Sequence, residues 1–322
     1  MKDVIRWGVL GAARIADQFV VPALQRSRNN RVAAIAARDP ARAAAFAGRH
    51  GIERVLAHYE DVLAAADIDA IYIALPTALH FEWCKRALLA GKHVLCEKPI
   101  AMHASEVEAL VALRERTGKL CAEAFMVAHH PQWHYVRDCL AQGLIGDLKL
   151  VEGAFSYFNE DPHALKNDRA LGGGGVRDIG VYPVVTTRLA TGLEPIRVEA
   201  DVEIDPRFGT DRFASARVAF DGFDLRFYCA TQLARRQQMT FHGTRGWLSL
   251  EAPFNPGVYG PAVVHLRTDA TASIRTEAFD GFDQYQLMVE DFADALLGTR
   301  PGPRFPLENS LGNQRVIDRI LG

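Results

Sequence analysis

Six short apolar runs alternate with amphipathic, alanine-rich segments through the first 125 residues, and this alternation constrains the fold more than any other feature. A strand, a helix and a second strand in succession form a βαβ unit, which builds a parallel sheet covered by helices. The apolar runs are Ile5–Leu10, Val32–Ala37, Val55–Tyr59, Ala70–Leu75, Val94–Cys96 and Leu120–Phe125. The segments predicted to be helical are Ile15–Arg26, Ala41–Arg49, His80–Ala90 and Ser105–Arg116. We therefore expect an α/β domain with a doubly wound parallel sheet over residues 1–124.

After about Phe125 the pattern changes to longer strands in which apolar and polar residues alternate. Strict alternation is typical of a strand with one buried face, so residues 125–322 are predicted to form an α+β domain with a large, mainly antiparallel open sheet. The predicted strands are Leu148–Phe158, Arg197–Ile204, Phe213–Phe220 and Leu225–Thr231. The predicted helices are Pro131–Gln142, Val176–Ala190, Tyr285–Leu297 and Asn309–Leu321. The terminal helix, Asn309–Leu321, is expected to be able to pack back on the first domain.

Length and charge exclude several classes of protein. The 322 residues favour two domains over one, because a single hydrophobic core rarely grows beyond about 250–300 residues. The formal charge of −2 provides no basic surface for nucleic acid. No apolar stretch approaches the ~20 residues of a membrane span, and no secretory leader precedes the apolar run that starts at Val4. We expect a cytoplasmic protein that binds neither nucleic acid nor membrane, with its five scattered cysteines reduced and buried.

The segment WGVLGAARIAD, Trp7–Asp17, is predicted to be a strand followed at once by a helix. The dinucleotide-binding pattern G-x-G-x-x-G is met as Gly11-x-Ala13-x-x-Ala16. Gly11 is expected to form the tight turn, and the small Ala13 lets the backbone approach a pyrophosphate at the helix N-terminus. The residues expected to contact the cofactor here are Gly8, Gly11, Ala12, Ala13, Arg14 and Ile15. Because two of the three glycines are replaced, a tight turn without a ligand stays as the alternative.

The end of the second predicted strand indicates which nicotinamide cofactor is bound. An NAD enzyme places an acidic residue here, about 20 residues past the glycines, to bind the ribose 2′-hydroxyl. This chain has Ala37 and then Arg38 and Asp39, with Arg42 one turn later. The two arginines are suited to a 2′-phosphate, which favours NADP. NAD stays possible, because Asp39 becomes the ribose acceptor if the strand is one or two residues longer; alternatively, Arg38 is a solvated charge.

Charged and polar residues close the fourth and fifth predicted strands. Ligands of a doubly wound sheet bind outside the carboxyl ends of its strands, so Lys98 in the sequence Glu97-Lys98-Pro99 is expected in the cofactor crevice. The alternative is a solvated ion pair between Glu97 and Lys98. After the fourth strand, Thr77 is either an N-cap or a ligand contact, and His80 either contacts the cofactor or caps the helix. The cofactor contacts predicted at these two ends are Leu75, Pro76, Thr77, His80, Glu97 and Lys98.

Together these motifs resemble the family of glucose-fructose oxidoreductase, inositol dehydrogenase and the rhizopine-catabolism oxidoreductases. The resemblance spans nearly the whole chain and rests on Gly8–Ala16, Leu75–His80, Glu97–Pro99 and the glycine-rich loop that runs into Arg177–Pro183. It implies an N-terminal Rossmann domain that holds NAD(P) and a C-terminal domain that supplies substrate contacts and the oligomer face. It also implies that Lys98 is catalytic and that Glu97 lies beside the nicotinamide ribose.

Many members of that family carry Asp-x-x-x-His in the second domain, whereas this chain carries Asp178-x-x-x-Tyr182, similar to the glucose-fructose oxidoreductase and dihydrodiol dehydrogenase branches. The i,i+4 spacing places both side chains on one face of a helix. Oxidation of a carbinol needs a base for the hydroxyl proton. We expect Tyr182 to exchange that proton, Lys98 to lower the pKa of Tyr182 and bond the reacting oxygen, and Asp178 to orient a neighbouring hydroxyl. Alternatively, Gly172–Gly175 and Tyr182 only join the domains.

The leading interpretation is an NADP-preferring dehydrogenase or reductase of a sugar or polyol. The segment Phe155–Gly175 is rich in aromatic, Asn, Asp and His side chains, which suit a polyhydroxylated ring. The alternatives are an enzyme similar to trans-dihydrodiol dehydrogenase and a cofactor-binding regulatory protein without turnover. Because alternating strands leave a broad sheet face that one chain does not cover, we expect an exposed apolar surface that forms a homodimer or homotetramer.

No metal is predicted. His130 and His134 have a zinc-like i,i+4 spacing on the helix that starts near Pro131, but neither a Glu-x-x-His motif nor a cysteine pair completes a site. Helix capping and pocket lining are therefore the preferred roles for these histidines. Relatives often carry an arginine where this chain has Ala128, which weakens any transfer of their substrate preference.

Overall fold

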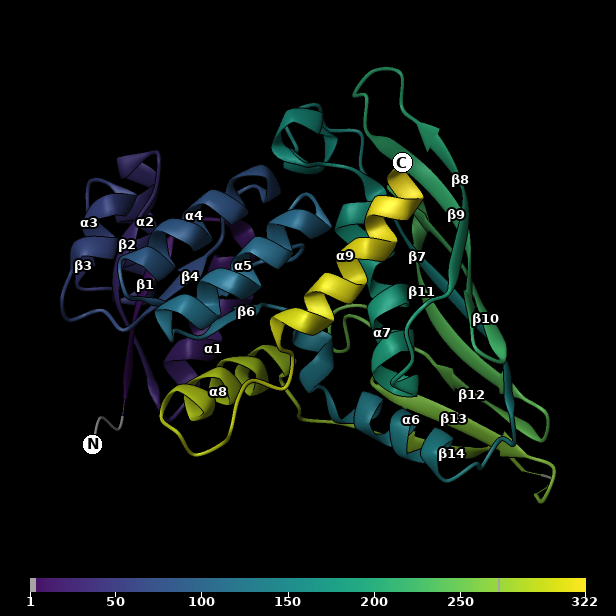
Figure 1. The fold of residues 1–322 in the computed structure, drawn as a ribbon. Helices are drawn as coiled ribbons and strands as arrows, with labels where there is room; N and C mark the ends of the chain where they lie inside the picture. The colour runs from purple at the N-terminus through teal and green to yellow at the C-terminus, as the bar shows by residue number, and fades with distance from the viewer. Residues whose placement is uncertain (1–3, 272) are drawn as a thin grey trace. The chain divides into compact units, whose positions relative to one another are not determined.

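The computed structural model describes residues 4–271 and 273–322, which divide into two compact units (Figure 1). The first unit comprises Met1–His129 and Asp283–Leu311, and the second comprises His130–Phe282 and Gly312–Gly322. This division is not the single boundary near residue 125 that the sequence suggests, because helix α8 (Gln284–Leu296) packs on α1 (Val21–Arg26) in the first unit. Helix α9 (Leu307–Leu321) begins in the first unit and ends in the second.

The sheet of the first unit is parallel and has the strand order β3-β2-β1-β4-β5-β6. Its strands are β1 (Ile5–Leu10), β2 (Asn30–Ala36), β3 (Arg54–Val55), β4 (Ala70–Ile73), β5 (His93–Cys96) and β6 (Cys121–Glu123). Its other helices are the π-turn η1 (Ala16–Val20), α2 (Pro40–His50), α3 (Tyr59–Ala64), α4 (Thr77–Leu89), α5 (Ala104–Thr117) and the 3-10 turn η2 (Met126–His129). Strands β1 to β3 are added toward one edge of the sheet, and strands β4 to β6 are added from β1 toward the other edge. This strand order confirms the predicted doubly wound fold.

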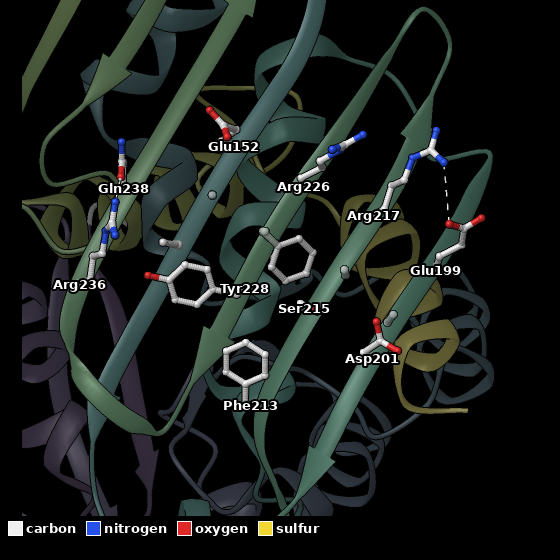
Figure 2. A pocket seen from close by; sticks show the side chains of 15 residues that line it. Glu152, Glu199, Asp201, Phe213, Ser215, Arg217, Arg226, Tyr228, Arg236 and Gln238 are labelled. Carbon is white, nitrogen blue, oxygen red and sulfur yellow. Dashed lines mark hydrogen bonds and ion pairs between the residues drawn. The ribbon is translucent and has the colours of Figure 1, made fainter.

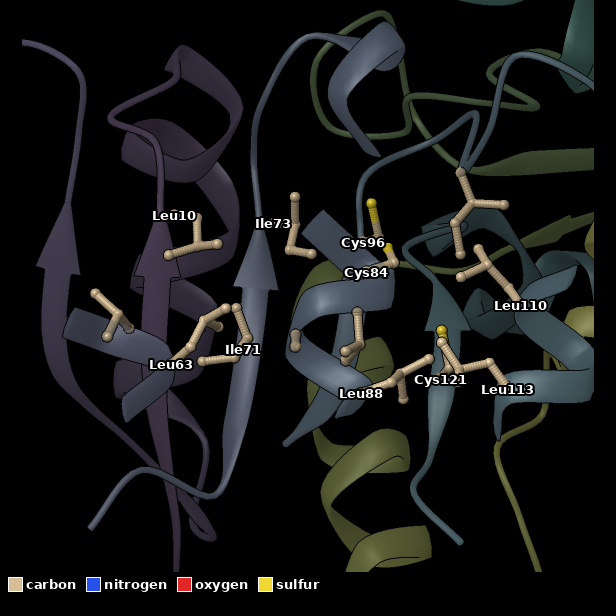
Figure 3. Packing of buried hydrophobic residues seen from close by; sticks show 14 of the residues in the cluster. Leu10, Leu63, Ile71, Ile73, Cys84, Leu88, Cys96, Leu110, Leu113 and Cys121 are labelled. Carbon is tan, nitrogen blue, oxygen red and sulfur yellow. The ribbon is translucent and has the colours of Figure 1, made fainter. Parts of the chain in front are cut away.

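Helices cover this sheet on both faces, which explains the apolar runs in the sequence. Figure 3 shows one face, where side chains of α3, α4 and α5 pack on the strands and the thiols of Cys84, Cys96 and Cys121 lie in the core. On β1, Trp7 packs against Phe292 of α8 at a centroid distance of 5.4 Å. A strand buried on both faces is apolar at successive positions and shows no alternation. All five cysteines, each among the described residues, are buried free thiols, as predicted.

The strand predicted at Val55–Tyr59 is present but shorter, because it ends at Val55. Only Arg54 and Val55 pair with β2, and Tyr59 is already the first residue of α3. The helix starts here because His58 and Asp61 form a reciprocal capping box, in which the Asp61 carboxylate accepts the His58 N–H at 3.0 Å. A capping box satisfies N–H groups that would otherwise lack partners at a helix start, and it therefore outweighs the strand preference of the apolar residues.

The second unit contains an eight-stranded sheet of order β14-β13-β12-β11-β7-β10-β9-β8. Its strands are β7 (Leu148–Phe158), β8 (Arg197–Ile204), β9 (Asp211–Phe220), β10 (Phe223–Ala230), β11 (Gln232–Gly243), β12 (Gly246–Leu250), β13 (Val263–Thr268) and β14 (Arg275–Ala278). Its helices and turns are α6 (Pro131–Ala141), η3 (Leu165–Asn167), η4 (Arg169–Leu171), the π-turn η5 (Val176–Gly180) and α7 (Val181–Thr191). The pairings are antiparallel except between β7 and β10, so the predicted mainly antiparallel sheet is confirmed. Within the described residues, none of the helices has both the length and the apolar character needed to cross a bilayer.

The two faces of this sheet differ in chemistry. On β10, Leu225, Phe227 and Cys229 are buried, and the strand packs against α7. The alternate residues Arg226 and Tyr228 line a broad hollow on the opposite face, where Figure 2 shows charged and polar side chains around aromatic rings. Its other labelled side chains are Glu152, Glu199, Asp201, Phe213, Ser215, Arg217, Arg236 and Gln238. The open face therefore combines charged and apolar residues, because alternation placed many of the apolar side chains under the helices.

Candidate active site

The loop after β1 has the shape of a phosphate-binding turn. Gly11 has a φ of +98°, and a Cβ there would lie 2.4 Å from the Ala74 carbonyl oxygen, so only glycine fits. The helix that follows begins at Arg14, which leaves the first-turn N–H groups directed at the loop formed by Ala12 and Ala13. The backbone of this loop therefore fits the pyrophosphate of a dinucleotide.

Two of the residues predicted to contact the cofactor in this segment serve other contacts. A Cβ on Gly8 would lie 2.3 Å from Val62 Cγ1 of α3, so Gly8 permits helix packing, and its cofactor contact stays a prediction. The Arg14 side chain donates to Gln18 Oε1 at 2.9 Å. The backbone at Arg14 and Ile15, rather than the arginine side chain, is thus the part of this turn placed to meet a phosphate.

The end of β2 favours the arginines over the carboxylate. The strand ends at Ala36, and Asp39 caps α2 by accepting N–H bonds from Ala41 at 2.9 Å and Arg42 at 3.3 Å. This cap already uses one oxygen of the carboxylate that an NAD enzyme would direct at the ribose. The Arg42 guanidinium donates to the Ala12 carbonyl at 3.2 Å, and so joins this strand end to the loop after β1. Arg38 is exposed, whereas the preceding Ala37 is buried.

His80 connects the ends of β4 and β5. Its ring is 1 % exposed, and its nitrogens lie 2.7 Å from the carbonyl oxygens of Leu75 and Pro99. Burial lowers the pKa of His80, an effect partly offset by those carbonyls and the nearby carboxyl groups. The ring thus holds the two strand ends together, and a contact of His80 with the cofactor stays a prediction. The helix begins at Thr77 after Pro76 with no side-chain cap, so both capping alternatives are wrong.

Glu97 and Lys98 follow β5, at the edge of the sheet where β1 and β4 also end. The Tyr72 hydroxyl donates to Glu97 Oε1 at 2.6 Å. Burial raises the pKa of Glu97, while this hydrogen bond and the Lys98 charge oppose the increase. The Lys98–Pro99 peptide bond is cis. Parallel strands thus bring Lys98 to the same edge as the Gly11 turn, two strands away, as the sequence predicts.

Glu123, at the end of β6, was missed by the sequence interpretation. It is 4 % exposed, and its Oε1 accepts the Ile100 N–H at 2.9 Å, just beyond the cis proline. Burial raises the pKa of Glu123, and the charges of His80 and Lys98 partly counter that increase. The signal was present in the sequence, because a glutamate that ends a short apolar run at the carboxyl edge of a parallel sheet faces the ligand side.

In the second unit, Asp178 and Tyr182 lie on successive elements rather than on one regular helix. Asp178 belongs to the π-turn η5, and Tyr182 is the second residue of α7. The π-turn widens the backbone here, and the i,i+4 placement of the two side chains on one face stays a prediction. Tyr182 is 4 % exposed, and its ring packs against Phe155 and Phe254 with centroids 5.3 Å from each.

Tyr157 and Lys166 are additional polar residues of this region. The Tyr157 hydroxyl donates to Asp178 Oδ2 at 2.5 Å, and Lys166 Nζ lies 3.5 Å from the same oxygen. Lys166 Nζ is also 4.1 Å from the centroid of the Tyr157 ring. The sequence placed both within a segment suited to a sugar but assigned neither a role, because alternation alone does not tell whether Tyr157 faces core or pocket.

The glycine-rich loop before Asp178 is held by a buried carboxylate. Asp211 Oδ2 accepts the Val176 N–H at 2.5 Å, and a Cβ on Gly174 would lie 2.0 Å from Asp211 Oδ1. Gly174 has a φ of +128°, so close approach and backbone conformation both require glycine. Burial raises the pKa of Asp211 to about 6.

The histidines near Pro131 serve the fold. His130 Nδ1 accepts the Gln132 N–H at 3.3 Å and caps α6, so the predicted capping role is confirmed. Burial and the His134 charge lower the pKa of His130 to about 4. Across residues 4–271 and 273–322, no three His, Cys, Asp or Glu side chains gather as a metal site would require.

Comparisons with known proteins agree with these features. Residues 5–125 match a family model described as an oxidoreductase family with an NAD-binding Rossmann fold, and residues 133–249 match the C-terminal domain model of the same family. The chain is 36% identical over 316 residues to D-xylose 1-dehydrogenase (NADP(+)) 2 of Haloferax volcanii, covering 98% of this chain and 95% of that protein. It is 32% identical over 253 residues to trans-1,2-dihydrobenzene-1,2-diol dehydrogenase of Xenopus tropicalis, covering 76% and 74%.

A solved structure extends the similarity to the whole fold. It is that of KijD10, a 3-ketoreductase from Actinomadura kijaniata, in complex with NADP and TDP-benzene. The two chains superpose with a TM-score of 0.91 at 31% identity, covering 99% of this chain and 97% of the other. Both domains are therefore shared with an enzyme of known reaction type.

Proposed function

Because this chain belongs to the oxidoreductase family of glucose-fructose oxidoreductase, inositol dehydrogenase and rhizopine catabolism, we propose that it transfers a hydride between NADP and a carbinol or carbonyl carbon of a sugar or polyol. The observation that carries the proposal is the position of Lys98, which leaves β5 at the sheet edge that also carries the Gly11 turn. That edge is where a doubly wound sheet binds dinucleotides. The similarity to the xylose dehydrogenase supports the substrate class, and the similarity to a 3-ketoreductase supports the reaction type.

The strand ends of the first unit fit the cofactor. The turn at Gly11 suits the pyrophosphate. Arg38 and Arg42 suit a 2′-phosphate better than Asp39 suits a ribose hydroxyl, because the Asp39 carboxylate already caps α2. NADP, when bound, supplies or accepts the hydride. Its preference over NAD is further supported by the NADP in the name of the xylose dehydrogenase and in the KijD10 complex.

We assign the remaining chemistry to three side chains. Tyr182 exchanges the proton of the reacting hydroxyl, and the Lys98 ammonium binds the same oxygen and favours the tyrosinate. Asp178 accepts a hydrogen bond from a neighbouring substrate hydroxyl. The aromatic ring of Tyr182 is fixed between Phe155 and Phe254, so its hydroxyl has little rotational freedom to lose when a substrate binds.

A cyclic diol is the second candidate substrate. It is favoured by the similarity to the dihydrobenzene-diol dehydrogenase and by the aromatic wall of Phe155, Tyr182 and Phe254, which suits a flat ring. The catalytic assignment would be the same, because both candidates present a hydroxyl beside the reacting carbinol. Turnover of trans-diols with no turnover of aldoses would select this alternative.

The first test is titration of the purified protein with NADPH and NADH, followed by nicotinamide fluorescence. Tighter binding of NADPH is expected from the arginines at the end of β2. Preference for NADH would instead assign the ribose contact to Asp39. Binding of NADPH without turnover of any aldose, polyol or diol would point to a regulatory protein, and failure to bind either cofactor would overturn the proposal.

The second test replaces Tyr182 with Phe. Turnover should fall by about 10²–10⁴-fold, because general acid–base catalysis is lost, while the Kd for NADPH changes little. Tyr259→Phe is the matched control, because it also removes one tyrosine hydroxyl, here in the loop between β12 and β13; this variant should retain activity. Unchanged turnover in Tyr182→Phe would show that the tyrosine is not the proton carrier.

A further inference from the structure

Three side chains from separate elements of the second unit converge on one oxygen atom. Tyr157 comes from β7, Lys166 from the turn η3, and Asp178 from the π-turn η5. Asp178 Oδ2 accepts the Tyr157 hydroxyl at 2.5 Å and lies 3.5 Å from Lys166 Nζ. Since both contacts fall on Oδ2, they fix the orientation of the carboxylate as well as its position.

We propose that Tyr157 is a positioning residue for Asp178, and that Lys166 and Asp178 together recognise the substrate hydroxyl adjacent to the reacting carbon. This inference rests on the proposed oxidoreductase function and deepens it. It predicts preference for a neutral 1,2-diol arrangement, because the cluster combines one positive charge, one negative charge and a neutral phenol.

Protonation fixes the direction of the hydrogen bond. Burial, and secondarily the Asp178 charge, raise the pKa of Tyr157 far above its usual value, so Tyr157 stays a phenol and donates its proton. Asp178 is then the acceptor of this hydrogen bond. Lys166 adds a cation over the face of the Tyr157 ring at 4.1 Å.

The backbone holds Lys166 and Asp178 at a fixed separation. The Gly174 N–H donates to the Lys166 carbonyl at 2.9 Å, and the Gly174 carbonyl accepts the Asp178 N–H at 3.0 Å. The side chain of the buried Asn167 donates to Asn159 Oδ1 at 2.9 Å and to the Asp161 carbonyl at 2.8 Å, which holds the loop that carries Lys166. The ion pair is therefore built on two anchored segments and is not a chance surface contact.

Accessibility divides the roles. The side chains of Lys166 and Asp178 keep 36% and 30% of their surface exposed, whereas Tyr157 is largely enclosed. A hydroxyl both donates and accepts, so a carboxylate and an ammonium side by side satisfy both of its capacities. Tyr157 holds this pair in place, because its hydroxyl donates to Asp178 and its ring lies against the Lys166 ammonium. In this proposal, Tyr182 exchanges the reacting proton.

The experiment compares an aldose with its 2-deoxy counterpart. With D-xylose or D-glucose, whichever the wild type turns over, Lys166→Met should raise KM by roughly 10-fold or more, the loss typical of a hydrogen bond to a charged group. With the 2-deoxy sugar, wild type and Lys166→Met should have nearly equal KM values, because the recognised hydroxyl is absent. Lys166→Arg should restore much of the loss, and the Kd for NADPH should stay constant.

Two further variants separate positioning from folding. Tyr157→Phe should move the acidic limb of the kcat/KM pH profile to higher pH, since Asp178 loses a donor that favours its ionised form. Lys149→Met, at an exposed position on the same strand β7, is the control and should change none of these values. Equal losses with the sugar and its 2-deoxy form would overturn the inference alone. Failure of the wild type to turn over any sugar, polyol or diol would overturn the proposed function and this inference with it.

Discussion

The two sheets present their functional residues in different ways. In the first unit, the strands are buried on both faces, and the candidate cofactor contacts lie in loops beyond the carboxyl ends of β1, β2, β4 and β5. In the second unit, the sheet is covered by helices on one face, and the polar cluster draws side chains from β7 and from the irregular segment before α7. The first site is therefore set mainly by chain topology, whereas the second depends on individual anchoring side chains.

The first prediction of this comparison concerns kcat/KM, and it tests whether the reaction takes place at the carboxyl end of β5 rather than at its amino end. Lys98 follows the carboxyl end of β5, and Lys92 precedes its amino end, where Nζ donates to the carbonyls of Ala65 at 2.6 Å and Ile68 at 2.8 Å. Lys98→Met should lower kcat/KM by about 10²–10³-fold, because a charge that stabilises the reacting oxygen is lost. Its melting temperature should stay close to that of the wild type.

Lys92→Met should do the reverse. Two buried carbonyls lose their donor, so the free energy of unfolding should fall by about 1–3 kcal/mol, while activity per folded molecule persists. Steady-state kinetics and thermal melting of both variants make the comparison. If Lys92→Met lost catalysis and Lys98→Met did not, the carboxyl edge of this sheet would not be the reaction site.

The next effect concerns the carboxylate that anchors the glycine-rich loop in the second unit. Burial raises the pKa of Asp211 to about 6, above its ordinary value of 3.8. The native state then binds the proton more tightly than the unfolded state, so the stability from this group is present at low pH and is lost as pH rises through about 6. The difference between the two pKa values corresponds to roughly 3 kcal/mol.

Asp211→Asn removes this dependence. The unfolding free energy of the wild type minus that of Asp211→Asn should therefore fall by about 2 kcal/mol between pH 4 and pH 7, measured by urea unfolding, because part of the effect is already lost at pH 4. Asp205→Asn is the matched control with the opposite sign, because the hydrogen bond from Arg207 lowers the pKa of Asp205. A pH-independent difference for Asp211→Asn would mean that the carboxylate is not buried against the loop in solution.

The sequence predicted the first unit better than the second, for a physical reason. Runs such as Ile5–Leu10 are apolar because both faces are buried, and the residue after such a run is placed by topology alone. The contact between Tyr157 and Asp178 joins β7 to a π-turn across 21 residues, and neither periodicity nor spacing encodes that register. His80 illustrates the limit within the first unit, since its position was predicted but its two carbonyl partners were not.

The sheet of the second unit also fell partly outside the prediction. The strand β11 contains a polar run, Arg235–Gln238, which masks its alternation. Arg236 and Gln238 line the open hollow, while Gln237 donates a hydrogen bond to Asn255 in the loop before β13. The same open face changes the basis of the expected oligomer. A second copy of this chain would have to meet charged side chains there as well as apolar ones.

The smallest expected effect on activity tests that open face. We still propose a homodimer or homotetramer, with charge pairing across the face that carries Arg217, Arg226 and Glu199 (Figure 2). Light scattering at micromolar concentration should give a mass of two or four chains. Arg226→Glu should weaken association by roughly 10-fold, as expected when one rim charge is reversed, and leave kcat nearly unchanged.

The matched control makes the same charge reversal on the first unit. Arg116 is exposed in the last turn of α5, so Arg116→Glu alters the net charge equally without touching the open sheet. It should leave the mass unchanged. If the wild type is a monomer, or if both variants dissociate alike, the charged face of β9 and β10 does not hold the copies together. The open sheet would then contribute to the protein only through its helix-covered side, where Tyr157 and Tyr182 lie.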